Sequence, residues 1–275
     1  MNFIELNGTV LRYELSGKGE ETIVLLHQMM GVLESWDWVL PKLREGQRVL
    51  RYDTRGAGMS EKLRGTAPID TMTADLEALL VALGIQGPVA VAGVAVGALI
   101  AMRFAAHYAE RVKALIAMSP ATGIPQERRA ATMSLAGEIE GKGMRAFADD
   151  MMDRQYPPSL RGDLERFEAM RCQFLSNDPG SVAAIYRMLA CVDMTDDFRR
   201  ITCPTLVIAG TVDLFRPPAG VQAVARSLPN ARFETIEAGH VMQIQAPERV
   251  AAAINGFLAD VAAGRFTKTA GSTAP

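Results

Sequence analysis

The chain has 275 residues, 49% of them hydrophobic and 22% charged, with a formal net charge of −2. This composition is typical of an ordinary globular protein, and the length suits one large α/β domain, with or without an inserted lid. The small net charge favours neither nucleic acid nor an anionic membrane as a partner, and no apolar run reaches the roughly 18 residues of a membrane span. Three cysteines without metal-ligand spacing and an N-terminus without a leader pattern lead us to expect a cytoplasmic protein.

The first part of the chain alternates between strand and helix patterns. Apolar and polar residues alternate on both sides of Asn7-Gly8, which is a strong signal for a hairpin turn. Short apolar runs then predict strands buried on both faces, and residues 35–45 can form a helix between two of them. An apolar period of 3.6 residues from Thr71 to Gly84 predicts an amphipathic helix.

Strand patterns recur along most of the chain. The strands that we expect are residues 2–6, 9–15, 23–27, 48–53, 89–92, 112–118, 205–209 and 231–236. Because these strands alternate with helical patterns, the sequence predicts an α/β fold with a mainly parallel, doubly wound sheet.

Residues 89–104 have the pattern of a buried strand that turns sharply into a helix. The strand meets Gly93, and Gly97 follows two residues after Ala95. Glycines at this spacing let the strand and the helix approach closely, and they predict a strained backbone with positive φ at the central residue. The stretch resembles the nucleophile elbow of the α/β-hydrolase family, in which the central residue is Ser, Cys or Asp. Here the central residue is Ala95.

The resemblance to α/β hydrolases also implies a domain organisation. Residues 124–200 contain several helical patterns and no convincing strand, and in this position the family carries a helical cap over the active site. The implied domains are an α/β-hydrolase core of residues 1–123 and 201–262, a helical cap of residues 124–200 and a flexible tail of residues 263–275. The tail is small, polar and unpatterned, so we expect it to be partly disordered.

Two downstream residues match the acid and the base of the family. Asp213 follows an apolar strand, at the edge where open α/β sheets place their sites. His240 follows the last expected strand and resembles the catalytic histidine of the family. The order elbow, Asp, His is the chain order of α/β hydrolases, so the resemblance implies that Asp213 and His240 are catalytic. His107 lies about 18 Å along the elbow helix from Ala95, which is too far from the site.

Two loops near the N-terminus resemble other parts of the same family. Residues 27–31, His-Gln-Met-Met-Gly, resemble its His-Gly-x-x-Gly loop, which implies that the backbone amides of Met29 and Val96 form the oxyanion hole. Gln28 stands in place of a glycine and brings a side chain towards the pocket. Residues 52–60, which contain Asp-Thr-Arg-Gly, resemble in sequence the corresponding loop of 3-oxoadipate enol-lactonases and their relatives. We expect a structural role for this loop.

Several side chains are candidates for the substrate pocket, and the cap contributes flexible methionines that suit an apolar ligand. The candidates are His27, Gln28, Trp36, Met151, Met152 and Met188. The cap has eleven Lys or Arg and thirteen Asp or Glu, a near balance that does not favour a strongly charged substrate. We therefore expect a small or medium-sized, partly apolar organic substrate and a monomer or homodimer. No motif for a metal, a phosphate loop or a nicotinamide is present, so we expect no cofactor.

Ala95 leaves three interpretations open. The protein is a serine-type hydrolase of esters, lactones or related acyl or C–C bonds in which an alanine has replaced the nucleophile and inactivated it. Alternatively, it is a cofactor-free dioxygenase or lyase that uses only His240 and Asp213, or it is a non-catalytic binding protein. Alanine at positive φ is strained where glycine would relax the backbone, and it is the smallest change from serine that keeps the elbow rigid. This comparison favours the first interpretation.

Overall fold

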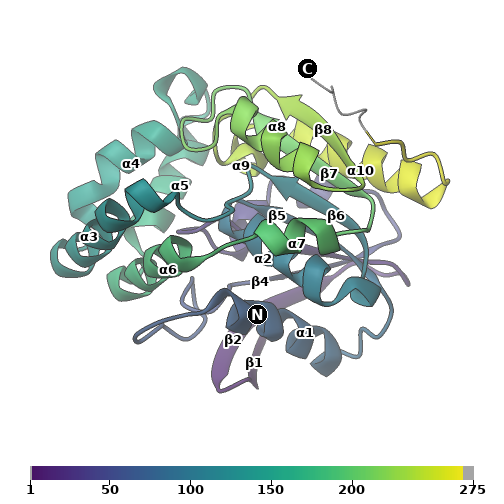
Figure 1. The fold of residues 1–275 in the computed structure, drawn as a ribbon, viewed down its shortest axis with the longest axis horizontal. Helices are drawn as coiled ribbons and strands as arrows, with labels where there is room; N and C mark the ends of the chain where they lie inside the picture. Colours follow the sequence, from purple (N-terminus) through teal and green to yellow (C-terminus); the bar gives the residue numbers. More distant parts are fainter. Residues whose placement is uncertain (1, 269–275) are drawn as a thin grey trace.

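The computed structural model describes residues 2–268, and its centre is one eight-stranded sheet (Figure 1). The spatial order of the strands is β1-β2-β4-β3-β5-β6-β7-β8. Pairing is antiparallel between β1 and β2 and between β2 and β4, and it is parallel from β4 to β8. The strands are β1 (Asn2–Leu6), β2 (Thr9–Ser16), β3 (Thr22–Leu26), β4 (Arg48–Tyr52), β5 (Val89–Val94), β6 (Val112–Met118), β7 (Thr205–Gly210) and β8 (Ala231–Ile236). The predicted mainly parallel α/β sheet is confirmed.

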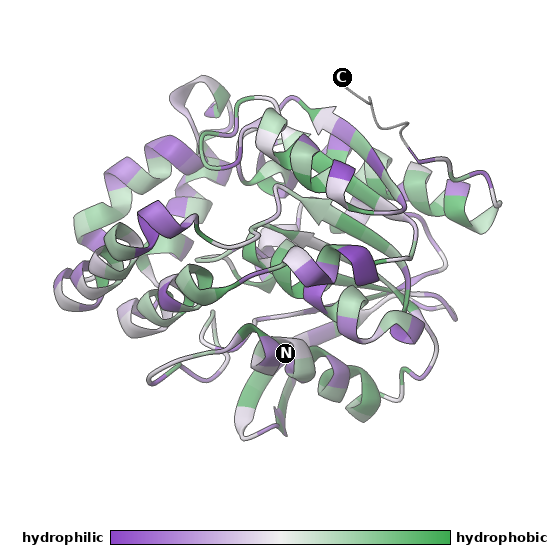
Figure 2. Cartoon of the chain, in the orientation of Figure 1, coloured by the Kyte–Doolittle hydropathy of each residue, from purple (hydrophilic) through white to green (hydrophobic). Residues whose placement is uncertain are grey.

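Helices cover both faces of this sheet. One face packs against α1 (Ile69–Ala82), α2 (Val96–His107) and α8 (Pro218–Ser227), and the other packs against α10 (Pro247–Ala262). Strands β3 and β5 in the middle of the sheet are buried at every position, and Figure 2 colours the central strands mostly as hydrophobic. Burial on both faces explains why these strands have continuous apolar runs instead of alternating patterns.

Four helices lie together at one end of the sheet, on the left in Figure 1. They are α3 (Gln126–Lys142), α4 (Ala148–Gln155), α5 (Leu164–Leu175) and α6 (Pro179–Cys191). Their inner side chains form an apolar cluster that also includes Met30, Val241 and Ile244 of the core loops. The cap therefore packs directly on the loops that follow β3 and β8.

Helix α7 (Thr195–Arg200) falls within the range predicted for the cap but contacts the core. Asp197 of α7 accepts hydrogen bonds from Arg103 and His107 of α2, the latter at 2.9 Å. Met194 and Ile201 beside it belong to the apolar core on the α2 face of the sheet. His107 is thus a residue of this helix contact at the far end of α2, as its distance from Ala95 predicted.

The helix predicted over residues 35–45 is wrong. This segment forms two short 3₁₀ turns, η1 (Leu33–Trp36) and η2 (Leu40–Lys42). Pro41 lies inside the predicted helix, where proline lacks a backbone donor and its ring clashes with the preceding turn.

The C-terminal prediction concerns residues that the structure describes only in part. Residues 265–268 have no helix or strand, and the rest of the predicted flexible tail lies outside the described residues. Within residues 2–268, no helix is both long enough and apolar enough to cross a membrane.

Candidate active site

The elbow places Ala95 at the carboxyl end of β5 with a φ of 52° and a ψ of −109°. The predicted positive φ is confirmed. The amide of Ala95 donates to the carbonyl of Met118 at 2.9 Å, and its carbonyl accepts from the amide of Ala121 at 3.1 Å. Both contacts tie the turn to β6 and the segment after it, so the strained conformation is held by its neighbours.

The two elbow glycines are required by close backbone contacts. A Cβ added to Gly93 would lie 2.4 Å from the carbonyl of Gly97, and a Cβ added to Gly97 would lie 2.5 Å from the carbonyl oxygens of Leu26 and His27. These distances are far below van der Waals contact. The sequence pattern Gly-x-Ala-x-Gly therefore reflects a packing constraint between β3, β5 and α2.

Asp213 and His240 form a hydrogen-bonded pair at the same edge of the sheet. The Nδ1 atom of His240 lies 2.9 Å from Oδ2 of Asp213, and Oδ1 of Asp213 accepts from the backbone amides of Phe215 and Arg216 at 2.8 and 2.9 Å. Both carboxylate oxygens are thus occupied, which fixes the orientation of the imidazole. Ala95 and His240 line the same cavity.

The environment of Asp213 favours its charged form. Burial alone raises its pKa, but the hydrogen bond and charge of His240 and the amide of Arg216 act in the opposite direction, and the resulting pKa lies below the usual value. Ser119 also has a positive φ, 43°. Its buried hydroxyl contributes to lowering the pKa of Asp213, although the hydroxyl has no partner within hydrogen-bond geometry. The carboxylate is therefore suited to orient and stabilise a protonated His240.

Met29 and Val96 are the two residues whose backbone amides the sequence predicts to form the oxyanion hole. Both residues line the cavity that contains Ala95 and His240, and Val96 is the first residue of α2, where the amides have no intrahelical acceptor. Asn177 of the cap donates to the carbonyl of Met30 at 3.0 Å, so a cap residue holds the loop that carries Met29. The oxyanion hole itself stays a prediction, and the structure places both of its residues at the wall of the main cavity.

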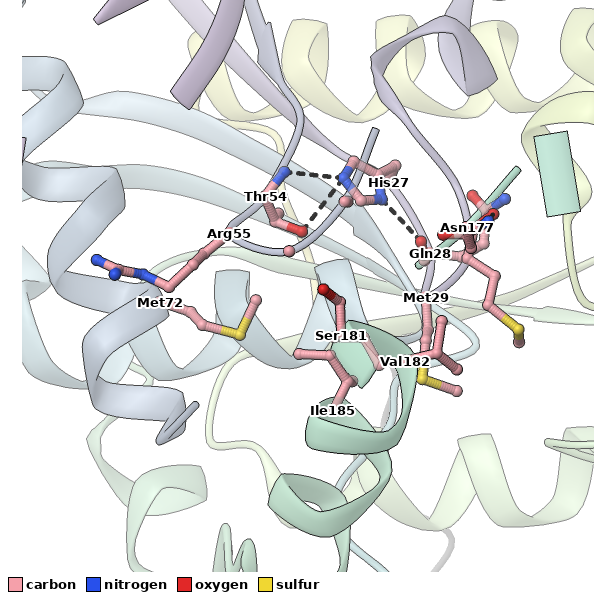
Figure 3. Close-up of a pocket in the computed structure, with 14 residues that line it drawn as sticks. His27, Gln28, Met29, Thr54, Arg55, Met72, Asn177, Ser181, Val182 and Ile185 are labelled. Atoms are coloured by element: carbon pink, nitrogen blue, oxygen red, sulfur yellow. Dashed lines mark hydrogen bonds between the residues drawn. The ribbon is translucent and has the colours of Figure 1, made fainter. Parts of the chain in front are cut away.

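His27 and Gln28 line a smaller neighbouring pocket between the core loops and α6 (Figure 3). The Nε2 atom of His27 accepts from the amide of Thr54 at 3.0 Å, so Nδ1 carries the proton and donates to the carbonyl of Gln28 at 2.7 Å. Burial lowers the pKa of His27, which keeps the ring neutral. His27 thus joins two loops and lines the smaller pocket, not the main cavity, and its place in the substrate pocket stays a prediction.

The side chain of Gln28 points to the short helix that follows β8 and does not line the main cavity. Its Oε1 accepts from Nε2 of Gln243 at 2.6 Å, and its amide group fills the space next to Gly31, where an added Cβ would meet it at 2.6 Å. The glycine of the family pattern is replaced without crowding Ala95, because Gln28 binds across to α9 (Met242–Gln245).

The main cavity has a volume of about 160 Å³ and lies between the strand ends and the cap. Of the predicted apolar pocket residues, Met151 lines it. Met152 packs inside the cap cluster, Met188 packs in the core, and Trp36 is fully buried beneath the sheet. These three side chains are turned towards apolar packing and do not line the main cavity.

Sequence reasoning missed several residues of the cavity wall. They are Arg128, Thr132, Leu135, Arg154, Gln155, Tyr186, Leu189, Phe215 and Arg216. Phe215 and Arg216 lie two and three residues after Asp213, and this proximity was an available signal. The cap residues carry no comparable signal, because the rotation of each cap helix decides which side faces inward. Within residues 2–268, no group of three or more His, Cys, Asp or Glu side chains is placed to hold a metal ion.

Comparisons with known proteins agree with this geometry. A family model described as serine aminopeptidase, S33, matches residues 18–240. The chain is similar to 3-oxoadipate enol-lactonase 2 of Acinetobacter baylyi, with 26% identity over 86% of this chain and 89% of the relative.

Solved structures are similar over nearly the whole chain. A thermophilic esterase from Thermogutta terrifontis, solved with malate bound, has 30% identity and a TM-score of 0.88 over 95% of this chain and 99% of its own. The enol-lactonase from Burkholderia xenovorans has 27% identity and a TM-score of 0.88 over 94% of this chain and 100% of its own.

Proposed function

Because the chain belongs to the α/β-hydrolase family, we propose that its main cavity is the site of a serine-type hydrolase of esters, lactones or related acyl compounds, with Ala95 at the position of the nucleophile. The observation that carries the proposal is the Asp213–His240 pair, hydrogen-bonded at 2.9 Å beside the elbow. The similar esterase and enol-lactonases support the substrate class.

In the serine form, the residues have distinct roles. Ser at position 95 attacks the carbonyl carbon while Nε2 of His240 takes the hydroxyl proton, and Asp213 stabilises the resulting imidazolium. The amides of Met29 and Val96 donate to the oxyanion. His240 then returns the proton to the leaving oxygen, and in the second half of the reaction it activates a water that hydrolyses the acyl-enzyme.

The alanine form lacks the oxygen that makes this bond. We propose that Ala95 is an inactivating replacement of serine, so the protein as it stands binds substrate without forming an acyl-enzyme. Loss of the nucleophile in serine hydrolases lowers turnover by about 10⁶-fold. The hydrogen-bonded Asp213–His240 pair is retained, which argues against the interpretation of a non-catalytic binding protein.

The test is the substitution Ala95→Ser, with Ala95→Gly as the matched control that relaxes the positive φ without adding a nucleophile. We expect Ala95→Ser to hydrolyse at least one member of a panel of aryl esters and lactones, at a rate several orders of magnitude above the alanine form, and to be labelled by a fluorophosphonate probe. If Ala95→Ser is as inert as Ala95→Gly towards the whole panel and the probe, the hydrolase proposal is wrong.

A second candidate function uses His240 as a general base without a covalent intermediate, as in a cofactor-free dioxygenase or lyase. The same hydrogen-bonded pair favours it, because Asp213 orients His240 whether or not position 95 carries a nucleophile. The alanine protein is screened for oxygen uptake or elimination with acidic heterocycles and β-hydroxy carbonyl compounds. Turnover that disappears in His240→Ala would replace the first proposal with this one.

A further inference from the structure

The wall of the main cavity carries three cations and no acidic side chain. Arg128 is in the first turn of α3, Arg154 is in the last turn of α4, and Arg216 follows Asp213 in the loop between β7 and α8. The cap as a whole has slightly more acidic than basic residues, so this positive charge is a local property of the cavity.

The three arginines have no carboxylate partner among the residues that the structure describes. Other arginines of the cap do: Arg161 pairs with Asp153 at 2.6 Å and Arg187 pairs with Glu140 at 2.5 Å. Arg154 and Arg216 are only partly exposed, and a cation withdrawn from water without a counterion is costly. The cavity therefore offers guanidinium groups whose hydrogen-bond donors are free for a ligand.

Arg154 is held in place by an aromatic ring next to the base. Its guanidinium carbon lies 4.4 Å from the centroid of Phe215, and the Phe215 ring lies 5.1 Å from the ring of His240. This stacking orients the guanidinium by a cation–π contact and leaves its edge available for hydrogen bonds. A group bound there lies on the His240 side of the cavity.

Arg216 and Arg128 repel each other. Burial lowers the pKa of Arg216, the charge of Asp213 raises it, and the nearby charge of Arg128 lowers it further. Asp213 does not neutralise Arg216 by a side-chain ion pair, because its oxygens bind His240 and two backbone amides. An anion between the two arginines would relieve their repulsion.

We propose that the ligand of this cavity carries an anionic group, a carboxylate or a phosphate, which Arg128, Arg154 and Arg216 bind while its ester or lactone group lies over Ala95. The arginine fork binds either anion through paired hydrogen bonds. The position of the reacting group rests on the proposed function, whereas the anion site does not depend on turnover.

Equilibrium binding to the alanine protein tests the anion site without any reaction. Monomethyl glutarate supplies a carboxylate and an ester, dimethyl glutarate is its neutral counterpart, and inorganic phosphate is the second anion. Titration calorimetry is performed on the unchanged protein, on Arg128→Gln, Arg154→Gln and Arg216→Gln, and on Arg145→Gln. Arg145 is exposed in the same cap and does not line the cavity, so its variant controls for the loss of one charge.

We expect the monoester to bind at least about tenfold more tightly than the diester, and each cavity variant to weaken its binding by about tenfold or more. Arg145→Gln should leave it unchanged. Arginine-dependent binding of phosphate, without a difference between monoester and diester, would assign the anion as phosphate. Equal affinity for monoester and diester without arginine-dependent binding of phosphate, or equal losses in Arg145→Gln and the folded cavity variants, would overturn the proposal. An inert Ala95→Ser form that still binds the monoester through these arginines would contradict only the proposed hydrolase.

Discussion

Asp213 is the residue on which the electrostatics of the site depend. It is 3% exposed, yet it remains a good hydrogen-bond acceptor because His240 and two backbone amides surround its carboxylate. Burial without these donors would raise its pKa and leave a neutral acid. The site therefore combines a low-dielectric position with a fixed negative charge.

This charge gives folding stability a defined pH dependence. The pKa of Asp213 is lower in the folded protein than in the unfolded chain, so the unfolded chain binds more protons near pH 4. The stability that this group contributes is therefore complete above the unfolded pKa, and it is lost as the pH falls through the folded pKa. We expect Asp213→Asn to lower the free energy of unfolding by about 1–3 kcal/mol at pH 7, and the difference from the unchanged protein to shrink below about pH 4.

Urea unfolding at neutral and acid pH measures this difference. Asp149→Asn is the control, since Asp149 is exposed on α4. A difference for Asp213→Asn that stays constant to the lowest pH at which the protein folds, or that matches Asp149→Asn at every pH, would contradict the assigned role of the carboxylate.

At the scale of the element, the rotation of α4 assigns different roles to adjacent methionines. Met151 belongs to the cap cluster and also lines the main cavity, whereas Met152 packs only within the cluster. Adjacent positions on a helix point about 100° apart, so Met151 faces the main cavity whereas Met152 packs only within the cap.

We expect Met151→Leu to change the preference for acyl chain length, by roughly threefold to tenfold in relative affinity, because a branched side chain reshapes the cavity wall. Met152→Leu is the matched control and should leave the preference unchanged. Binding of neutral esters of increasing acyl length to the alanine protein measures the effect. If Met152→Leu shifts the preference as much as Met151→Leu, the cavity wall is not where the structure places it.

At the scale of the whole molecule, net charge and local charge have opposite signs. The chain carries a formal charge of −2, but the cavity is lined by three arginines and no carboxylate. Long-range attraction of an anion to this protein is therefore weak, and binding depends on short-range contacts inside the cavity.

We expect the affinity for monomethyl glutarate to fall only roughly twofold to fivefold between about 0.05 M and about 0.5 M NaCl, since partly buried pairs are screened less than surface pairs. Dimethyl glutarate should show no such decrease. Calorimetry across a salt series measures both slopes. A decrease of the same size for the neutral diester would show that salt acts on something other than the arginine contacts.

The sequence by itself determined the parallel sheet and the elbow. Strand patterns depend on local apolar runs, and the elbow depends on two glycines, Gly93 and Gly97, whose Cβ atoms would collide with neighbouring backbone. Ala95, Asp213 and His240 each follow the carboxyl end of an expected strand. Because parallel strands end on the same side, the sequence also placed all three residues at one edge of the sheet. These features are local or follow from topology.

Only the tertiary structure decided what the cavity wall contains. Charge counting over the cap indicated near balance, yet Arg128 and Arg154 of the cap line the cavity together with Arg216 of the core, and no acidic side chain lines it. His27 and Met188, candidates for the pocket, are used elsewhere in packing and loop contacts. The physical reason is that helix rotation and side-chain direction depend on contacts between distant segments, which neither composition nor periodicity records.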